Sequence, residues 1–186
     1  MNKILISLVA LATLTTASNA TLIGAWAPDK KVGNMSISAG QATIGKKSNT
    51  MYTLDLGGNY YYDNGIMWGA SFGLGYTKNP DTTVSNKTMG EIDGKFRFGY
   101  SFGETAKGLG VYGIADFSYL MYMSRNATNT DDEFESANGI GFGAGAEYVF
   151  DSGLLITTSY TTTTMTSDTG TKFDYDKVLV GIGFSW

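Results

Sequence analysis

Hydrophobic and polar residues alternate along most of the chain. In residues 89–102 (MGEIDGKFRFGYSF), charged side chains occupy one parity, while isoleucine, phenylalanine and tyrosine occupy the other. Strict alternation with a period of two is typical of a β-strand with two unlike faces. Similar stretches separated by turn-forming residues predict eight strands, at 34–45, 50–62, 65–77, 88–102, 108–124, 136–150, 153–166 and 172–186.

The links between these strands are of two kinds, which alternate along the chain. Short links rich in residues that tolerate a positive φ lie at 63–65, 103–108 and 151–153. Polar and looser links lie at 78–87 and 125–135, with shorter ones at 45–49 and 167–171. An antiparallel up-and-down meander with an even number of strands, and with both termini at the short-turn end, accounts for this alternation.

Strands that approach the short-turn end finish with two aromatic residues on the same parity. The pairs are Tyr60 and Tyr62, Tyr100 and Phe102, Tyr148 and Phe150, and Phe184 and Trp186. Matched endings of this kind predict an aromatic girdle at a membrane interface rather than isolated core contacts.

The two faces of the predicted strands differ in size as well as in polarity. One parity carries bulky residues, such as Trp68, Phe72 and Tyr76 on a single strand, whereas the other is mostly glycine, serine or charge. The interior of an eight-stranded barrel cannot hold all the bulky side chains at native packing density. We therefore predict an all-β fold, an eight-stranded antiparallel up-and-down transmembrane β-barrel with its bulky residues facing lipid. A soluble lipocalin-like binder is the inverse architecture and the main rival.

Eight charged residues fall on the inward parity. They are Asp55, Glu91, Asp93, Lys95, Arg97, Asp116, Glu147 and Lys177. Because an isolated buried ion is far costlier than a paired one, we expect pairs across the lumen, such as Lys95 or Arg97 with Asp116 or Asp55. The cluster has three interpretations: a structural salt-bridge plug, a narrow ion path, or a catalytic group.

The first residues have the pattern of an export signal. A lysine at position 3 precedes an apolar run at 4–12 and small residues ending at Ala20. This predicts a signal peptide at 1–20, with cleavage after Ala17 as the weaker alternative, then a lead at 21–33 and the barrel at 34–186. The apolar run is too short to span a membrane as a helix.

Composition removes several classes of function. The chain has no cysteine and no histidine, and its net charge is −4. It therefore has no disulfide framework and no basic patch for a nucleic acid, and we expect no cofactor and no metal. The acidic residues Asp131, Asp132, Glu133 and Glu135 have oxygen ligands for Ca²⁺, but they lack a regular ligand spacing, so a solvated acidic loop is favoured.

The export signal, the eight alternating strands, the short turns at one end and the C-terminal aromatic together resemble small Gram-negative outer-membrane barrels of the OmpA and OmpX class. The resemblance covers residues 34–186 and implies residence in the bacterial outer membrane with a periplasmic lead. The same resemblance implies a monomeric barrel that contacts lipid and lipopolysaccharide. It also implies that the barrel-assembly machinery reads Val180, Ile182, Phe184 and Trp186. The Pro-rich linker and peptidoglycan-binding domain of OmpA have no counterpart, so cell-wall attachment is not expected.

Enzymes among the small barrels use histidine in catalysis, and this chain has none. A hydroxyl without an activating base is a poor nucleophile, so no enzymatic activity is expected.

Two functions of different class remain. The first function is a structural or surface-interaction barrel whose loops at 78–87 and 125–135 contact lipopolysaccharide, host surfaces or phage. The alternative is a narrow pore for small solutes or ions.

Overall fold

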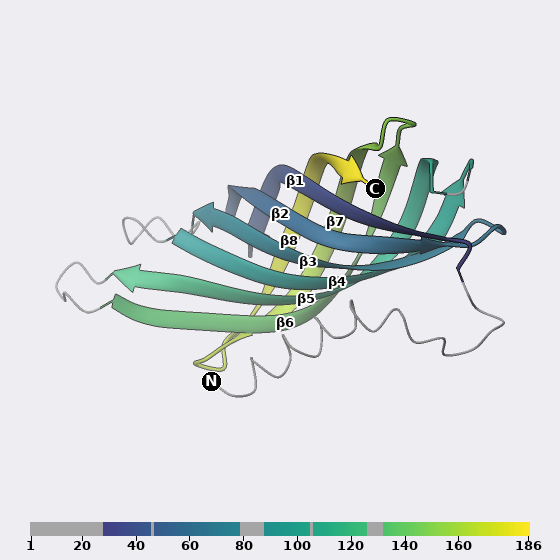
Figure 1. Cartoon of the computed structure of the whole chain (residues 1–186). Helices are drawn as coiled ribbons and strands as arrows, with labels where there is room; N and C mark the ends of the chain where they lie inside the picture. Colours follow the sequence, from purple (N-terminus) through teal and green to yellow (C-terminus); the bar gives the residue numbers. More distant parts are fainter. Residues whose placement is uncertain (1–27, 46, 79–87, 105, 126–131) are drawn as a thin grey trace.

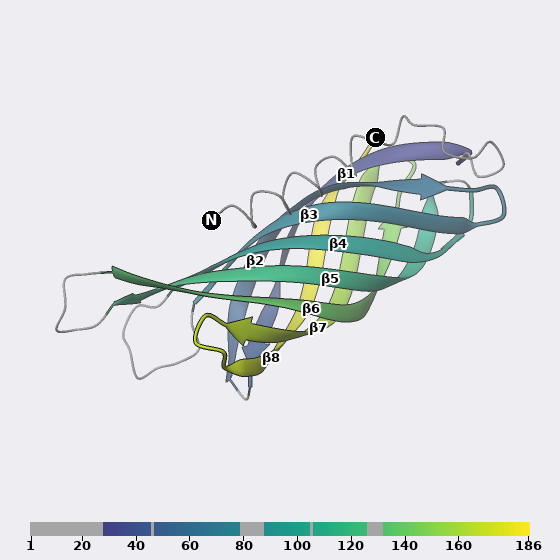
Figure 2. The same ribbon diagram turned by 90° about the horizontal axis from the view of Figure 1, so that it is seen from below.

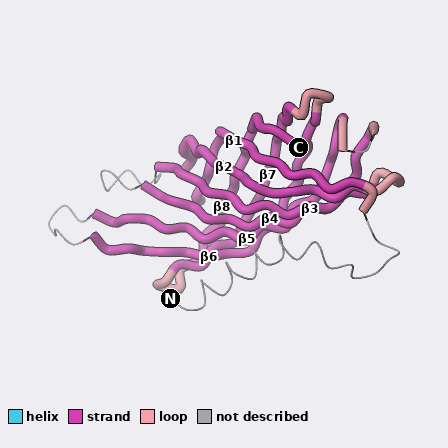
Figure 3. The backbone as a smooth tube through the Cα atoms, in the orientation of Figure 1, coloured by secondary structure: helices cyan, strands magenta, loops and turns pink. Residues whose placement is uncertain are grey.

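The chain folds into one closed antiparallel β-barrel. The computed structural model describes residues 28–45, 47–78, 88–104, 106–125 and 132–186. The strands follow one another around the barrel in chain order, from β1 to β8, and β8 pairs with β1 to close it (Figure 1). The described residues are strands joined by turns, as the tube in Figure 3 shows. This confirms the predicted fold class.

The eight strands differ from their predicted ranges mainly at their ends. They are β1 (Lys30–Ile44), β2 (Lys47–Tyr61), β3 (Ile66–Lys78), β4 (Thr88–Phe102), β5 (Gly108–Arg125), β6 (Asp132–Val149), β7 (Leu154–Ser167) and β8 (Lys172–Ser185). Three strands begin earlier than predicted because their charged or polar first residues were assigned to a lead or a loop. Lys30 pairs with Tyr61, so the lead predicted at 21–33 overlaps β1. Asp132 pairs with Arg125, so β6 begins inside the predicted loop at 125–135.

The strands are strongly staggered around the barrel. A row of paired residues that starts at Asn34 on β1 passes through every strand and returns to β1 at Ile44. Each step around the barrel therefore moves toward the far end, as expected for tilted strands. The tilt is visible in Figure 2, where β2 to β6 run obliquely side by side.

Short turns occur at both ends of the barrel. At the end that holds the start of β1 and the C-terminus, here called the turn end, Gly65 and Gly153 take φ values of 84° and 82°. At the opposite end, here called the loop end, β1 and β2 are separated only by residues 45–46, and Gly170 takes a φ of 81° in the link from β7 to β8. The predicted contrast between the ends was therefore too strong. The longer links after β3 and β5 lie largely outside the described residues, and β5 and β6 extend beyond their neighbours at this end (Figure 1).

The bulky residues point outward, as predicted. Phe142 and Ile140 on β6 are 68% and 65% exposed, and the outward residues of β8 run Val178, Val180, Ile182, Phe184. At the turn end the aromatic endings form contacting pairs, with ring centroids 4.9 Å apart for Tyr100 and Phe102 and 4.8 Å apart for Tyr148 and Phe150. A second set of outward tyrosines, Tyr52, Tyr76 and Tyr160, ends the apolar belt toward the loop end.

None of the described residues forms a helix long and apolar enough to cross a membrane.

Candidate functional site

The eight charged residues predicted for the lumen all lie there. Asp55 comes from β2, Asp116 from β5, Glu147 from β6 and Lys177 from β8, and the remaining four come from alternate positions of β4. Each is at most 7% exposed: Asp55, Glu91, Asp93, Lys95, Arg97, Asp116, Glu147 and Lys177. Parity places them inside because successive strand residues point to opposite faces.

Lys177 is the centre of the larger group of ion pairs. Its Nζ lies 2.7 Å from Glu91 Oε1, 3.2 Å from Asp116 Oδ2 and 3.4 Å from Asp93 Oδ2. The phenol of Tyr175 donates to the other oxygen of Glu91 at 3.1 Å. Hydroxyls of Ser118 and Thr163 donate to Asp116 at 2.8 and 3.0 Å. One ammonium thus faces three carboxylates, with neutral hydroxyls supplying further donors.

Lys95 and Arg97 form two smaller groups toward the turn end. Lys95 Nζ lies 2.5 Å from Asp55 Oδ1 and 3.1 Å from Asp93 Oδ2, so Asp93 joins Lys95 to the Lys177 group. Arg97 lies 3.7 Å from Glu147 and donates to Ser71 at 2.8 Å. Glu147 also accepts hydrogen bonds from Asn59 and Tyr61, both at 2.9 Å.

The sequence predicted only part of this pairing. Lys95 pairs with Asp55, which was one of the expected combinations. Arg97 pairs instead with Glu147, and Asp116 with Lys177. The stagger of the strands decides which side chains meet across the lumen, and alternation within single strands does not contain that information.

Glycines on β3 provide the space into which the charged side chains extend. A methyl group at Gly73 would overlap the Asp93 carboxylate and lie 3.0 Å from Asp55 Oδ1. A methyl group at Gly75 would overlap the end of Met51 and lie 3.1 Å from Glu91. The inward glycines of β3 are therefore part of the site, because larger residues there would displace the ion pairs.

Two apolar layers in the lumen were missed by the sequence analysis. The layer toward the loop end is built from Ala42, Met51, Met89, Leu120, Ala137, Met165, Tyr175 and Leu179. The layer toward the turn end is built from Val32, Tyr61, Met67, Ala106, Tyr112 and Ile114. The charged network lies between them. The members that lie on strands point inward by the same alternation as the charges, so the sequence identifies them, whereas Ala106 lies in the link between β4 and β5.

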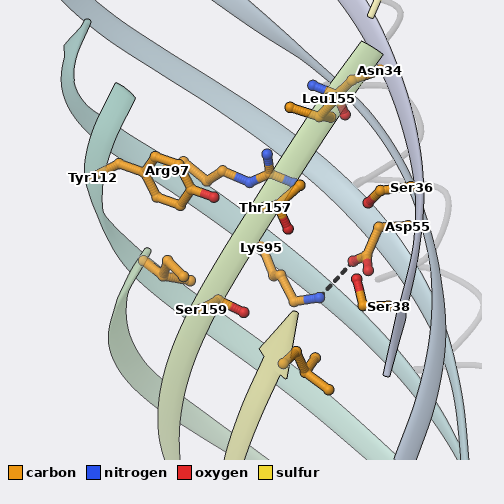
Figure 4. A pocket seen from close by; sticks show the side chains of 12 residues that line it. Asn34, Ser36, Ser38, Asp55, Lys95, Arg97, Tyr112, Leu155, Thr157 and Ser159 are labelled. Atoms are coloured by element: carbon orange, nitrogen blue, oxygen red, sulfur yellow. Dashed lines mark hydrogen bonds and ion pairs between the residues drawn. The ribbon is translucent and has the colours of Figure 1, made fainter. Parts of the chain in front are cut away.

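A small cavity of about 20 Å³ lies beside Lys95 and Arg97. Figure 4 shows both side chains reaching toward hydroxyls from β1 and β7, among them Ser36, Ser38 and Thr157. A polar cavity of this size holds about one water molecule. The cavity shows that the network does not fill the lumen completely on the side of β1 and β7.

The other predicted sites have different outcomes. Val180, Ile182, Phe184 and Trp186 all point outward at the end of β8, so they lie on the lipid-facing side of the closing strand. Asp131 of the acidic cluster lies outside the described residues, and its other members begin β6, where only the backbone is described. No cluster suited to a metal ion occurs among the side chains that the structure describes.

A closed barrel with a charged lumen and an apolar, aromatic-bordered exterior defines a membrane-spanning barrel of the outer-membrane type. The chain belongs to the family of the outer membrane protein β-barrel domain, which it matches over residues 6–186. It is accordingly a protein of the bacterial outer membrane, which confirms the predicted class and location.

Solved structures share the fold at low sequence identity. Neisserial surface protein A is 12% identical, with a TM-score of 0.60 over 83% of this chain and 96% of that one. Ail, the attachment invasion locus protein of Yersinia pestis, is 14% identical, with a TM-score of 0.53 over 84% and 98%. The N-terminal barrel of Pseudomonas aeruginosa OprF is 18% identical, with a TM-score of 0.50 over 83% and 99%. No curated protein sequence matches the chain significantly.

Proposed function

We propose that the protein is a closed outer-membrane barrel with a structural or surface-contact role, and that it neither conducts solutes nor catalyses a reaction. The observation that carries this proposal is the buried network of ion pairs in the lumen. The paired charges around Lys177, Lys95 and Arg97 lie between two apolar layers, and the cavity beside them is about 20 Å³. A hydrated ion needs a wider continuous path than a space for one water molecule.

The proposal places the loop end outside the cell. The links after β3 and β5, predicted at 78–87 and 125–135, would then meet lipopolysaccharide or another surface, and a monomeric barrel would contact lipid through its apolar belt. Two structural neighbours carry names that refer to a surface protein and to attachment, and Ail has also been solved with the heparin analogue sucrose octasulfate. Since these neighbours share only the fold, their names support a surface role in general and no particular ligand.

A non-catalytic role is supported by the chemistry available in the lumen. The chain has no histidine. The buried hydroxyls of Ser118 and Thr163 donate to Asp116, whose Oδ2 also pairs with Lys177 at 3.2 Å. This carboxylate is engaged by a cation and two hydroxyls, so it is poorly placed to activate a nucleophile.

Conductance across a planar bilayer tests the closed lumen. We expect no reproducible channels from the wild-type protein and none from a Lys172→Ala control on the exposed end of β8. Reproducible wild-type channels whose conductance changes in an Arg97→Ala variant would contradict the proposal and establish a path through the network.

A narrow pore is the second candidate. The observation in its favour is the polar cavity itself, which lies on the side of the lumen lined by small hydroxyl residues of β1 and β7. Channels in the wild-type protein that prefer cations would support it, because the network holds more acids than bases.

A further inference from the structure

The outward face of β7 differs from the outward faces of the strands beside it. β6 presents Ile140 and Phe142, and β8 presents Val178 and Val180. The outward residues of β7 toward the loop end are instead Tyr160, Thr162 and Thr164, and all three are exposed. A column of hydroxyls therefore interrupts the apolar exterior on this side of the barrel.

Two carboxylates on β8 extend this column. The register pairs Thr162 with Asp176 and Thr164 with Asp174. Asp174 is exposed, Asp176 is half-buried, and both share the outward parity of Val178. Tyr160, Thr162, Thr164, Asp174 and Asp176 together are called the β7–β8 polar face below.

The polar face lies at the margin of the apolar belt toward the loop end. On β8 the outward residues change from valine at position 178 to aspartate at 176 and 174, with no further apolar residue on that parity before Lys172. Tyr160, which is 47% exposed, pairs with Val178, the last outward apolar residue of β8 before Asp176. Tyrosines are enriched at membrane interfaces. In a barrel that spans a membrane, an outward-pointing face at the margin of the apolar belt is expected to meet the lipid headgroups.

The hydrogen-bonding capacity of this face is largely unused within the protein. The phenol of Tyr160 donates to Asp176 and the hydroxyl of Thr164 donates to Asp174, each at 3.5 Å, which is at the long limit of a hydrogen bond. Carboxylates accept strongly, threonine hydroxyls both donate and accept, and the tyrosine ring offers an apolar surface. This combination of acceptors, donors and an apolar ring suits the hydroxyls and the ring faces of a neutral polyol. Two neighbouring carboxylates would repel a bare phosphate.

We propose that the β7–β8 polar face binds the saccharide headgroup of a glycolipid in the outer leaflet. Sugar hydroxyls would donate to Asp174 and Asp176 and exchange hydrogen bonds with Thr162 and Thr164. The proposal rests on the proposed function only in placing the loop end outward, and it holds whether or not the lumen conducts. A second copy of the chain is a poorer occupant, because a two-fold contact centred here would oppose the two carboxylates to their own counterparts.

Binding of rough lipopolysaccharide to the full barrel in detergent micelles tests this proposal. Native mass spectrometry would compare that lipid, its dephosphorylated form and phosphatidylglycerol, each with and without EDTA. Two variants probe the face: Asp174→Asn with Asp176→Asn, and Thr162→Val with Thr164→Val, which keeps the side-chain shape. Thr88→Val is the matched control, because Thr88 begins β4 on the same outward parity but away from this face.

The expected result is binding of both lipopolysaccharide forms in preference to phosphatidylglycerol, unaffected by EDTA. Each double variant should weaken it by about tenfold or more, since hydrogen bonds from sugar hydroxyls to the carboxylates or to the threonine hydroxyls are lost. The control variant should bind as the wild type does.

Three results would overturn the proposal. They are equal binding by both double variants and the wild type, binding that depends on the phosphates or is abolished by EDTA, and a change from dimer to monomer in the variants. The last would assign the face to a second copy. Channel recordings on the same samples report on the closed lumen separately, so failure of one proposal is distinguishable from failure of the other.

Discussion

Replacing Lys177 with methionine should destabilise the barrel severely. The methionine side chain is of similar length, so the change removes the charge with little change in volume. Lys177 is 1% exposed and lies within 2.7–3.4 Å of three carboxylates. Removing the cation leaves Glu91 and Asp116 without any other ion-pair partner among the described side chains, while Asp93 keeps Lys95.

The size of this effect follows from the cost of leaving buried charge uncompensated. Removing one partner of a buried ion pair typically costs about 3–5 kcal/mol, far more than the pair contributes relative to apolar residues. We expect Lys177→Met to lower the free energy of unfolding by about that amount. Adding Glu91→Gln should recover part of the loss, because the amide removes one uncompensated charge.

Reversible urea unfolding in lipid vesicles measures this difference. Lys172→Met is the matched control, because Lys172 lies on the same strand but is exposed at its end, and surface changes of this kind usually stay within about 0.5 kcal/mol. A loss below about 1 kcal/mol for Lys177→Met would refute the view that the three carboxylates depend on this ammonium.

Three further predictions concern other parts of the barrel. Gly73→Ala should lower the urea midpoint, because its methyl group overlaps a network carboxylate, whereas Gly113→Ala, with its nearest neighbour atom 3.8 Å away, should leave it almost unchanged. At the turn end, the hydrogen bond from Lys107 to Asp151, 3.0 Å long, raises the pKa of the ammonium, so Asp151→Asn should return that pKa toward its ordinary value in an NMR titration. Trp186→Ala should reduce the amount of folded barrel in cells, measured by heat-modifiable mobility on a gel, but not the amount obtained by unassisted refolding. Equal losses in the two experiments would contradict a role of Trp186 as an assembly signal.

The fold was predictable because alternation is a local property of each strand. The eight charges that parity assigned to the inward face are all buried, since a residue and its second neighbour share a face. Strand ends were harder: Lys30 and Asp132 are charged, and a charged residue can begin a strand that extends beyond the membrane as readily as it can occupy a loop.

The partners within the site were not predictable from single strands. Arg97 meets Glu147 rather than Asp55 because of the stagger, which depends on all eight pairings at once. The two apolar layers were not predicted for a different reason. Met51 and Tyr175 are inward by parity, but the same face also carries the glycines and the charges, so a more uniformly polar lumen was expected.

The network has a physical role even if its net contribution to stability is small. A one-residue slip in the pairing of β4 would turn Glu91, Asp93, Lys95 and Arg97 toward lipid and its phenylalanines into the lumen. Charge on the lipid face costs about 2–4 kcal/mol per Lys or Arg at the midplane. Four charges on one strand therefore separate the native register from its neighbours by more than the ion pairs themselves contribute. Replacing the whole network with apolar residues should thus preserve stability yet weaken the choice of register, which a single disrupted pair cannot reveal.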